Sequence, residues 1–277
     1  AARQDMLQII FFACFFGVAV AHIGEKGTLI VNFCQSVAEA MFKVTNYVMH
    51  FAPLGVFAMI AYTVGSYGIT MLIPLGKLIL SVAGATALFI AVVATIASVF
   101  TKINFFHLIL ALKDILFLAF STASSEAALP GAMKRLHRLG VPEATVTFVM
   151  PTGYSFNLDG STLYSSAGIL FIAQLYGIAM PIEQQLLVMV TLMLSTKGIA
   201  GVPGAGIIVV AATAAAFNLP TEGVAILLGI DRILDMIRTI CNVCGNCMAT
   251  VVVSCWEKEL NKDKFNRLYK EFREEKL

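Results

Sequence analysis

Long apolar stretches, separated by short polar connections, occupy most of the chain. Met6–Ile23 and Leu72–Phe100 approach or exceed the length of about 20 residues that a helix needs to cross a bilayer. Val31–Ser66 is longer and has polar residues toward its middle, which favours a bent or tilted element. The pattern therefore predicts three membrane helices in the first hundred residues.

After Thr101 the apolar stretches become too short to span a bilayer. Leu108–Phe120 leads into the small-residue segment Ser121–Pro130, and Leu186–Leu194 leads into a second one, Ser195–Gly206. We interpret each as a re-entrant helical hairpin, which enters the membrane, turns at a small-residue tip and leaves on the same side. Irregular backbone at that depth must be buried in protein or line a wet cavity.

Each predicted hairpin is followed by a longer apolar segment that polar residues interrupt. These segments are Val146–Tyr176 and Val224–Cys255, so a unit of hairpin plus broken helix occurs twice, over about 105–177 and about 183–255. Interrupted segments at matching positions of two halves are typical of transporter binding sites. The sequence thus predicts an all-α membrane protein of the inverted-repeat secondary-transporter class.

Composition and charge support a bilayer as the solvent. Hydrophobic residues make up 58% of the 277 residues and charged residues 13%, whereas soluble domains have about 25% charge. This composition indicates membrane lipid as a partner, and the net charge of +2 is too small to suggest nucleic acid. Basic residues cluster at 134–138 and after Trp256, and the loops at 177–185 and 217–222 contain none. This distribution places the base of the first hairpin and the C-terminus in the cytoplasm.

The last apolar segment has a polar stripe. At 100° per residue its main members fall within roughly 80° of one another on a helix. Buried charges of this kind need partners, because each costs at least about 2.5–3.5 kcal/mol in a membrane. A guanidinium can hold a carboxylate with two hydrogen bonds, and a carboxylate one turn earlier can accept from an ammonium group. An Asp–Arg network that only holds helices together is the alternative. The stripe comprises Asp231, Asp235, Arg238, Asn242 and Asn246, with Thr239 at its border.

The hairpin tips and the first helix break offer further ligand groups. Ser124–Ser125 and Val202–Gly206 would present backbone N–H groups at half-helix ends, where anions are favoured. Asn157–Gly160 would expose carbonyl oxygens beside one carboxylate, which suits a hard cation. A local turn closed by Asp159 is an equally good interpretation of that segment.

Taken together, these motifs resemble those of the dicarboxylate/amino acid:cation symporters, the family that includes the glutamate transporters. The closest likeness is to the bacterial proton/sodium–glutamate symporters. The matching residues are Ser124-Ser125 with Ala128-Leu-Pro130, Asn157-Leu-Asp-Gly160, Gly198-Ile-Ala-Gly-Val-Pro203 and Asp235-Met-Ile-Arg-Thr239 with Asn242.

The resemblance implies a homotrimer in which transport domains move like elevators against a scaffold. It divides the chain into scaffold-type helices (1–70), a transport-domain helix (71–100), a transport core (101–256) and a solvated cytoplasmic tail (257–277). The likeness begins at the family's fourth helix, so we expect the N-terminal helices to be missing and the chain alone not to transport. A bacterial inner membrane is the expected location.

The resemblance also implies roles for individual residues. Arg238 would hold the side-chain carboxylate of the substrate and Asp235 its amino group. The rest of the substrate pocket would comprise Ser124, Ser125, Ser161, Val202, Gly206, Thr239 and Asn242. The cation positions would be Gly153, Ser155, Asn157, Asp159, Thr196, Ile199 and Asn242.

One departure from the family pattern concerns coupling. Asn246 stands where sodium-coupled relatives have an aspartate, and a neutral amide is a weaker cation ligand. Bacterial proton–glutamate members resemble this chain there and also have a glutamate at the first tip, as Glu126 is here. Glu126 is therefore the proton-coupling candidate.

The predicted function is symport of L-glutamate or L-aspartate with protons, sodium or both, without an enzymatic activity or cofactor. A C4-dicarboxylate symporter is the first alternative. A redox or metal protein built on Cys241, Cys244 and Cys247 is a second. An intramembrane hydrolase using Ser124, Ser125 or Asp159 is a third, but no histidine lies in the polar motifs to act as a base.

Overall fold

The computed structural model describes residues 6–198 and 204–274 and divides the chain into two compact units, 1–58 and 59–277. The first unit contains α1 (Met6–His22), α2 (Thr28–Met49) and the start of α3 (Ala52–Tyr67). The single bent element predicted over 31–66 is therefore wrong, since two helices meet at residues 50–51. Pro53 accounts for the break, because proline disfavours helical backbone in the residue before it and fits the first turn of a new helix.

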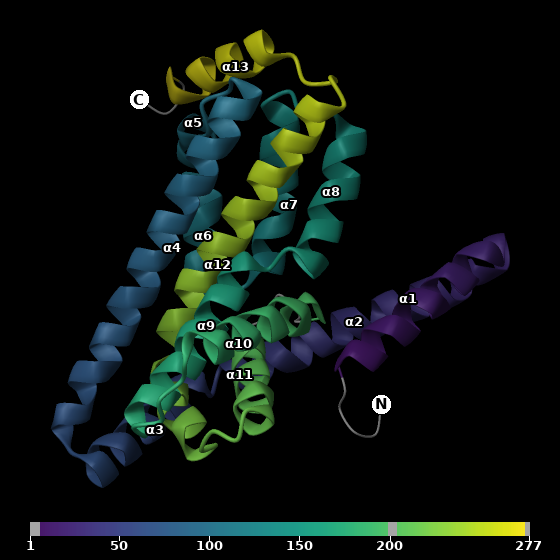
Figure 1. Ribbon diagram of the computed structural model, residues 1–277. Helices are drawn as coiled ribbons and strands as arrows, with labels where there is room; N and C mark the ends of the chain where they lie inside the picture. Colours follow the sequence, from purple (N-terminus) through teal and green to yellow (C-terminus); the bar gives the residue numbers. More distant parts are fainter. Residues whose placement is uncertain (1–5, 199–203, 275–277) are drawn as a thin grey trace. The chain divides into compact units, whose positions relative to one another are not determined.

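The second unit is built around two long helices that lie side by side, α4 (Leu72–Thr101) and α12 (Glu222–Trp256) (Figure 1). Shorter helices pack along them. In chain order these are α5 (Phe105–Ala111), α6 (Lys113–Thr122), α7 (Ser125–Arg138), α8 (Glu143–Phe156), α9 (Asp159–Leu175), α10 (Ile182–Ser195), α11 (Ala205–Ala216) and α13 (Lys262–Glu274). Short 3-10 turns cover Gly24–Gly27, Ile69–Met71 and Thr196–Gly198. The described residues form only helices and connections, as the sequence predicts.

A helix–turn–helix pair forms where the first hairpin is predicted. α6 and α7 contact one another and are joined by a two-residue turn. Ala123 has the left-handed conformation there (φ 51°), and the hydroxyl of Ser124 accepts from the N–H of Ala127 at 3.3 Å. This bond caps α7, because the first N–H groups of a helix have no partner within it. α10 and α11 form the corresponding second pair.

The two predicted helix breaks have different outcomes. The chain breaks between α8 and α9 at Asn157 and Leu158, as predicted. By contrast, α12 is one continuous helix of 35 residues, so the predicted interruption of the second segment is wrong. The polar side chains of α12 leave its backbone hydrogen bonds intact, since they project from one face and find partners on other elements.

Two hydrophobic clusters occupy the two ends of this unit. One joins α5–α8 to the end of α4 and the second half of α12. The other joins α9–α11 to the start of α4 and the first half of α12. The centre of the polar stripe of α12 lies between these clusters.

The C-terminal segment forms the helix α13, most of whose described residues are exposed, but one of its faces packs against other helices. Phe265 is fully buried, and the ring of Tyr269 stacks on His107 of α5 with centroids 4.3 Å apart. Nζ of Lys262 also donates to the carbonyl of Thr101 at 2.5 Å. The sequence did not predict this packing, because the mixed charge of α13 conceals an apolar face whose partners, on α5 and beside Gly140, are distant in sequence.

Among the described residues, the helical stretch Ile69–Thr101 is long and apolar enough to cross a membrane. The pair α5–α6 passes the same test only if its two helices, bent by 61°, count as one span. α3, α10 and α11 are apolar but shorter.

Candidate functional site

The polar stripe lies at the midpoint of α12. A helix of 35 residues is about 52 Å long, and Arg238 is its seventeenth residue. Every polar residue that the sequence places on this stripe is buried, as predicted; they are Asp231, Asp235, Arg238, Thr239, Asn242 and Asn246.

A buried ion pair forms the centre of the site. Asp235 and Arg238 are 2% and 3% exposed, and Nε of Arg238 donates to Oδ1 of Asp235. The second carboxylate oxygen accepts from the N–H of Gly204 at 2.6 Å. Gly204 immediately precedes α11, so the second helix pair contacts this carboxylate directly. Two opposite charges with hydrogen-bonding partners are the form in which charge is tolerated in an apolar interior.

Ser161 of α9 connects Arg238 to the next turn of α12. Its hydroxyl accepts from Nη1 of Arg238 at 3.0 Å and from Nδ2 of Asn242 at 3.2 Å. Oδ1 of Asn242 accepts in turn from the N–H of Gly160 at 2.8 Å. Thus a side chain of α12 satisfies an N–H in the first turn of α9, which has no partner within its own helix.

Glycines allow α9 and α11 to approach the site closely. A Cβ atom on Gly206 would lie 2.8 Å from Nη1 of Arg238 and 2.9 Å from the ring of Tyr164. One on Gly160 would lie 2.7 Å from Cβ of Cys241. Real Cβ contacts are longer than these, so any side chain at either position would push the helices apart.

Polar groups also meet at the break between α8 and α9. One terminal atom of the Asn157 amide lies 3.1 Å from Oδ1 of Asn246, and the other lies 3.0 Å from Oδ1 of Asp159. A carboxylate only accepts, so the NH2 group of Asn157 faces Asp159. A Cβ on Gly153 would overlap the Asn246 amide, and one on Gly245 would lie 3.1 Å from the carboxylate of Asp159. This cluster of oxygen-bearing side chains could contact a hard cation.

The remaining predicted positions are more scattered. Thr196 is buried, and its hydroxyl lies 2.8 Å from that of Thr162 in α9. Ser125 is buried and Glu126 half-buried at the start of α7, next to the helix cap formed by Ser124. Three predictions fall outside what the structure describes, namely Ile199, Val202 and the side chain of Ser155.

Sequence reasoning missed residues whose partners are distant in the chain. The hydroxyl of Tyr164 donates to Asp231 at 2.6 Å, and Cζ of Arg238 lies 5.9 Å from the centre of its ring. Nη2 of Arg232 donates to the carbonyl of Thr122 at 3.2 Å, which ties α12 to the end of α6. Tyr164 lies three residues after Ser161, so helical spacing from a predicted site residue could have identified it.

The cysteine run does not form a metal centre within the described part of the chain. Cys241, Cys244 and Cys247 are buried free thiols. No group of three or more His, Cys, Asp or Glu side chains in the described ranges could hold a metal ion. Cys244 and Cys247 pack in the first hydrophobic cluster as small apolar residues.

Comparison with known proteins shows to which family the chain belongs. The model of the sodium:dicarboxylate symporter family matches residues 1–256. The chain belongs to this family. Its members are transporters, which supports a non-enzymatic role and a place in the membrane.

Several curated relatives in the symporter family are similar over most of the chain. The proton/sodium-glutamate symport protein of Geobacillus stearothermophilus is 53% identical over 95% of this chain and 62% of its own length. The proton/glutamate-aspartate symporter of Escherichia coli is 47% identical over 95% of this chain and 60% of its own. The C4-dicarboxylate transport protein of Bacillus subtilis is 40% identical over 95% and 63%. The chain thus spans about three fifths of the length of these relatives.

Proposed function

We propose that this chain provides the substrate-binding part of a symporter for L-glutamate or L-aspartate. The supporting observation is the buried pair of Asp235 and Arg238, with Ser161 and Asn242 beside it. An acidic amino acid has an ammonium group for Asp235 and a side-chain carboxylate for Arg238. Binding would replace one buried ion pair by two, so that no charge in the site loses its partner.

The same logic separates amino acid from dicarboxylate substrates. A C4-dicarboxylate could engage Arg238 but has no cation for Asp235, which would remain a buried carboxylate without its guanidinium. The chain is 53% identical to the glutamate symport protein and 40% identical to the C4-dicarboxylate protein, which also favours an amino acid as the substrate. Dicarboxylates are therefore the second candidate substrates.

Coupling to protons, with or without sodium, follows from the second polar cluster and from the relatives. The oxygen-bearing side chains at the α8–α9 break would receive a cation, with Asn246 as a neutral neighbour of Asp159. Glu126, in the first turn of α7, is the candidate for proton transfer. The ion is cargo in this scheme, moved together with the amino acid.

The domain assignment and the membrane arrangement belong to the same proposal. Residues 1–70 would form scaffold helices, 71–100 a transport-domain helix and 101–256 the transport core, with re-entrant hairpins and elevator movement in a homotrimer. The basic end of α7 lies near α13, since a Cβ on Gly140, two residues after Arg138, would lie 3.5 Å from the side chain of Leu268. Both would face the cytoplasm of a bacterial inner membrane, as the distribution of Lys and Arg indicates.

The test is uptake of labelled L-glutamate by a full-length protein with this sequence in proteoliposomes. An inward proton gradient is applied with and without sodium, and excess L-aspartate or succinate is added as competitor. We expect proton-driven uptake that aspartate blocks more strongly than succinate. Stronger block by succinate would favour the dicarboxylate carrier, and uptake indifferent to the proton gradient would exclude proton coupling.

A matched pair of variants assigns the carboxylate partner. Arg238→Ala should abolish uptake, because the substrate would lose its only cationic partner in the pocket described here. Lys270→Ala, an exposed cation on α13, should transport as the wild type does. Normal glutamate uptake by the Arg238 variant would refute the assignment.

A further inference from the structure

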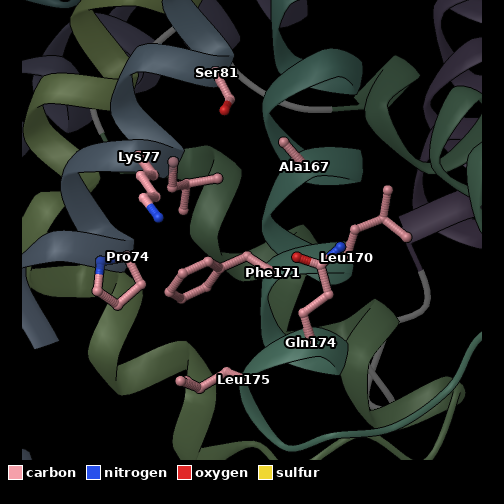
Figure 2. A pocket seen from close by; sticks show the side chains of 9 residues that line it. Pro74, Lys77, Ser81, Ala167, Leu170, Phe171, Gln174 and Leu175 are labelled. Atoms are coloured by element: carbon pink, nitrogen blue, oxygen red, sulfur yellow. The ribbon is translucent and has the colours of Figure 1, made fainter.

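A cavity of about 530 Å³ lies between α4 and α9, and none of its lining residues is among those assigned to the substrate (Figure 2). Its polar side chains are Lys77 and Ser81 from α4 and Gln174 from α9. Apolar side chains line the rest, among them Leu170 and Phe171. Nothing in the proposed transport cycle uses this cavity.

Lys77 gives the cavity one positive charge. Figure 2 shows its side chain and that of Phe171 extending toward one another across the space. No acidic residue is among the lining residues. Within the described part of the chain, Lys77 forms no ion pair or hydrogen bond, and it is solvent-exposed. Its ammonium group is therefore accessible to an anion that enters the cavity.

The depth of Lys77 along α4 identifies the surroundings that would supply the counter-ion. α4 has 30 residues and is about 45 Å long, close to the thickness of a bilayer with its headgroups. Lys77 lies five residues after Leu72, about 7.5 Å from the end of the helix. Since the hydrocarbon layer is about 30 Å thick, this position is at the boundary between headgroups and acyl chains.

The neighbouring side chains agree with that depth. Gln174 is the penultimate residue of α9, so both helices place polar groups at the same boundary. On α4, Ile73 and Leu80 flank Lys77 and are 61% and 74% exposed, as expected for residues that face acyl chains. The cavity thus combines a cation and hydrogen-bonding groups at headgroup level with an apolar lining.

We infer that this cavity binds an anionic phospholipid, with the headgroup phosphate on Lys77 and one acyl chain against Leu170 and Phe171. Gln174, at the same level as Lys77, is placed to donate to the phosphate or glycerol oxygens. A lysine ammonium holds a phosphate as a point charge, and the apolar lining favours an acyl chain beside it. The inference is independent of which amino acid or ion the protein transports.

The experiment uses the purified full-length protein with phosphatidylglycerol that has a photoreactive group in one acyl chain. After irradiation, mass spectrometry measures labelling of the peptides that contain residues 74–81 and 167–175. The same measurement with photoreactive phosphatidylcholine tests the requirement for negative charge. We expect the anionic probe to label both peptides at least about five-fold more strongly, the ratio expected for one lysine near an anionic headgroup.

Variants separate charge, shape and general lipid contact. Lys77→Gln should reduce labelling about five-fold and Lys77→Arg should retain it. Ala167→Phe, which fills the cavity and keeps the lysine, should also reduce labelling. Lys102→Gln, at the other end of α4, is the control and should not change labelling of these peptides. Monodisperse elution of each variant checks that it is folded.

Three outcomes would overturn the inference. Equal labelling by the two probes would mean that the cavity accepts any lipid. Undiminished labelling of Lys77→Gln would mean that the lysine has no part in binding. Complete competition by soluble glycerol phosphate would identify a free anion as the occupant. None of these readouts requires glutamate uptake, so they stand apart from the test of transport.

Discussion

The strongest test of the central ion pair is the substitution Asp235→Asn, measured on stability and binding together. It leaves the guanidinium of Arg238, 3% exposed, without its carboxylate partner. Removing one member of a buried pair costs about 3–5 kcal/mol. At roughly 2–4 °C per kcal/mol for a chain of this size, the thermal midpoint should fall by roughly 6–20 °C.

A double variant distinguishes a binding site from a structural clamp. Asp235→Asn with Arg238→Met removes both charges, and an uncharged pair of similar volume has no buried ion to leave without a partner. We therefore expect the double variant to recover more than half of the lost thermal stability. Neither variant should bind L-glutamate, because the single variant lacks the ammonium partner and the double variant lacks both partners.

The assay is thermal unfolding of the purified full-length protein in detergent, with and without saturating L-glutamate. Ligand that binds only the folded state raises the midpoint, so a glutamate-dependent shift reports binding in the same experiment. Additive losses in the double variant would refute the coupling of the pair. A glutamate-dependent shift that survives in the double variant would refute its role in recognising the substrate.

Three other predictions test the close approach at the site, its cation cluster and the docked tail. Gly206→Ala should weaken glutamate binding about ten-fold, because an added Cβ would lie 2.8 Å from the central guanidinium and overpacking costs about 1–3 kcal/mol. Gly84→Ala, where no atom lies within 4 Å, is the control, and equal affinities in isothermal calorimetry would contradict the packing argument. Asn246→Asp should lower the sodium concentration that half-saturates glutamate binding by at least about ten-fold. The reason is that a second carboxylate near a cation contributes several kcal/mol at short range. An unchanged sodium titration would count against a cation at the helix break. Phe265→Ala should destabilise the protein by about 3–5 kcal/mol, because this ring is fully buried, whereas Lys270→Ala on the exposed face should not; matching melting curves would mean that α13 is not docked in solution.

The sequence by itself determined most of the helices and the composition of the site. Apolar runs and small-residue tips predicted the α6–α7 turn, and the Asn-Leu-Asp-Gly segment predicted the break before α9. Helical periodicity alone put Asp235, Arg238 and Asn242 on one buried face. These features are local, because turn chemistry and the 3.6-residue period act within one or two helical turns.

The tertiary structure decided which groups meet across the chain. The bonds from Ser161 to Arg238 and Asn242 join residues about 80 positions apart, and the bond from Tyr164 to Asp231 joins residues 67 apart. The same holds for the continuity of α12. Its polar residues predict a break in the helix, and only their partners on other helices explain why the helix continues. It also holds for α13, whose apolar face packs on α5 and beside Gly140. Partners of this kind are fixed by how helices pack, and no periodicity within one segment encodes which distant helix will be the neighbour.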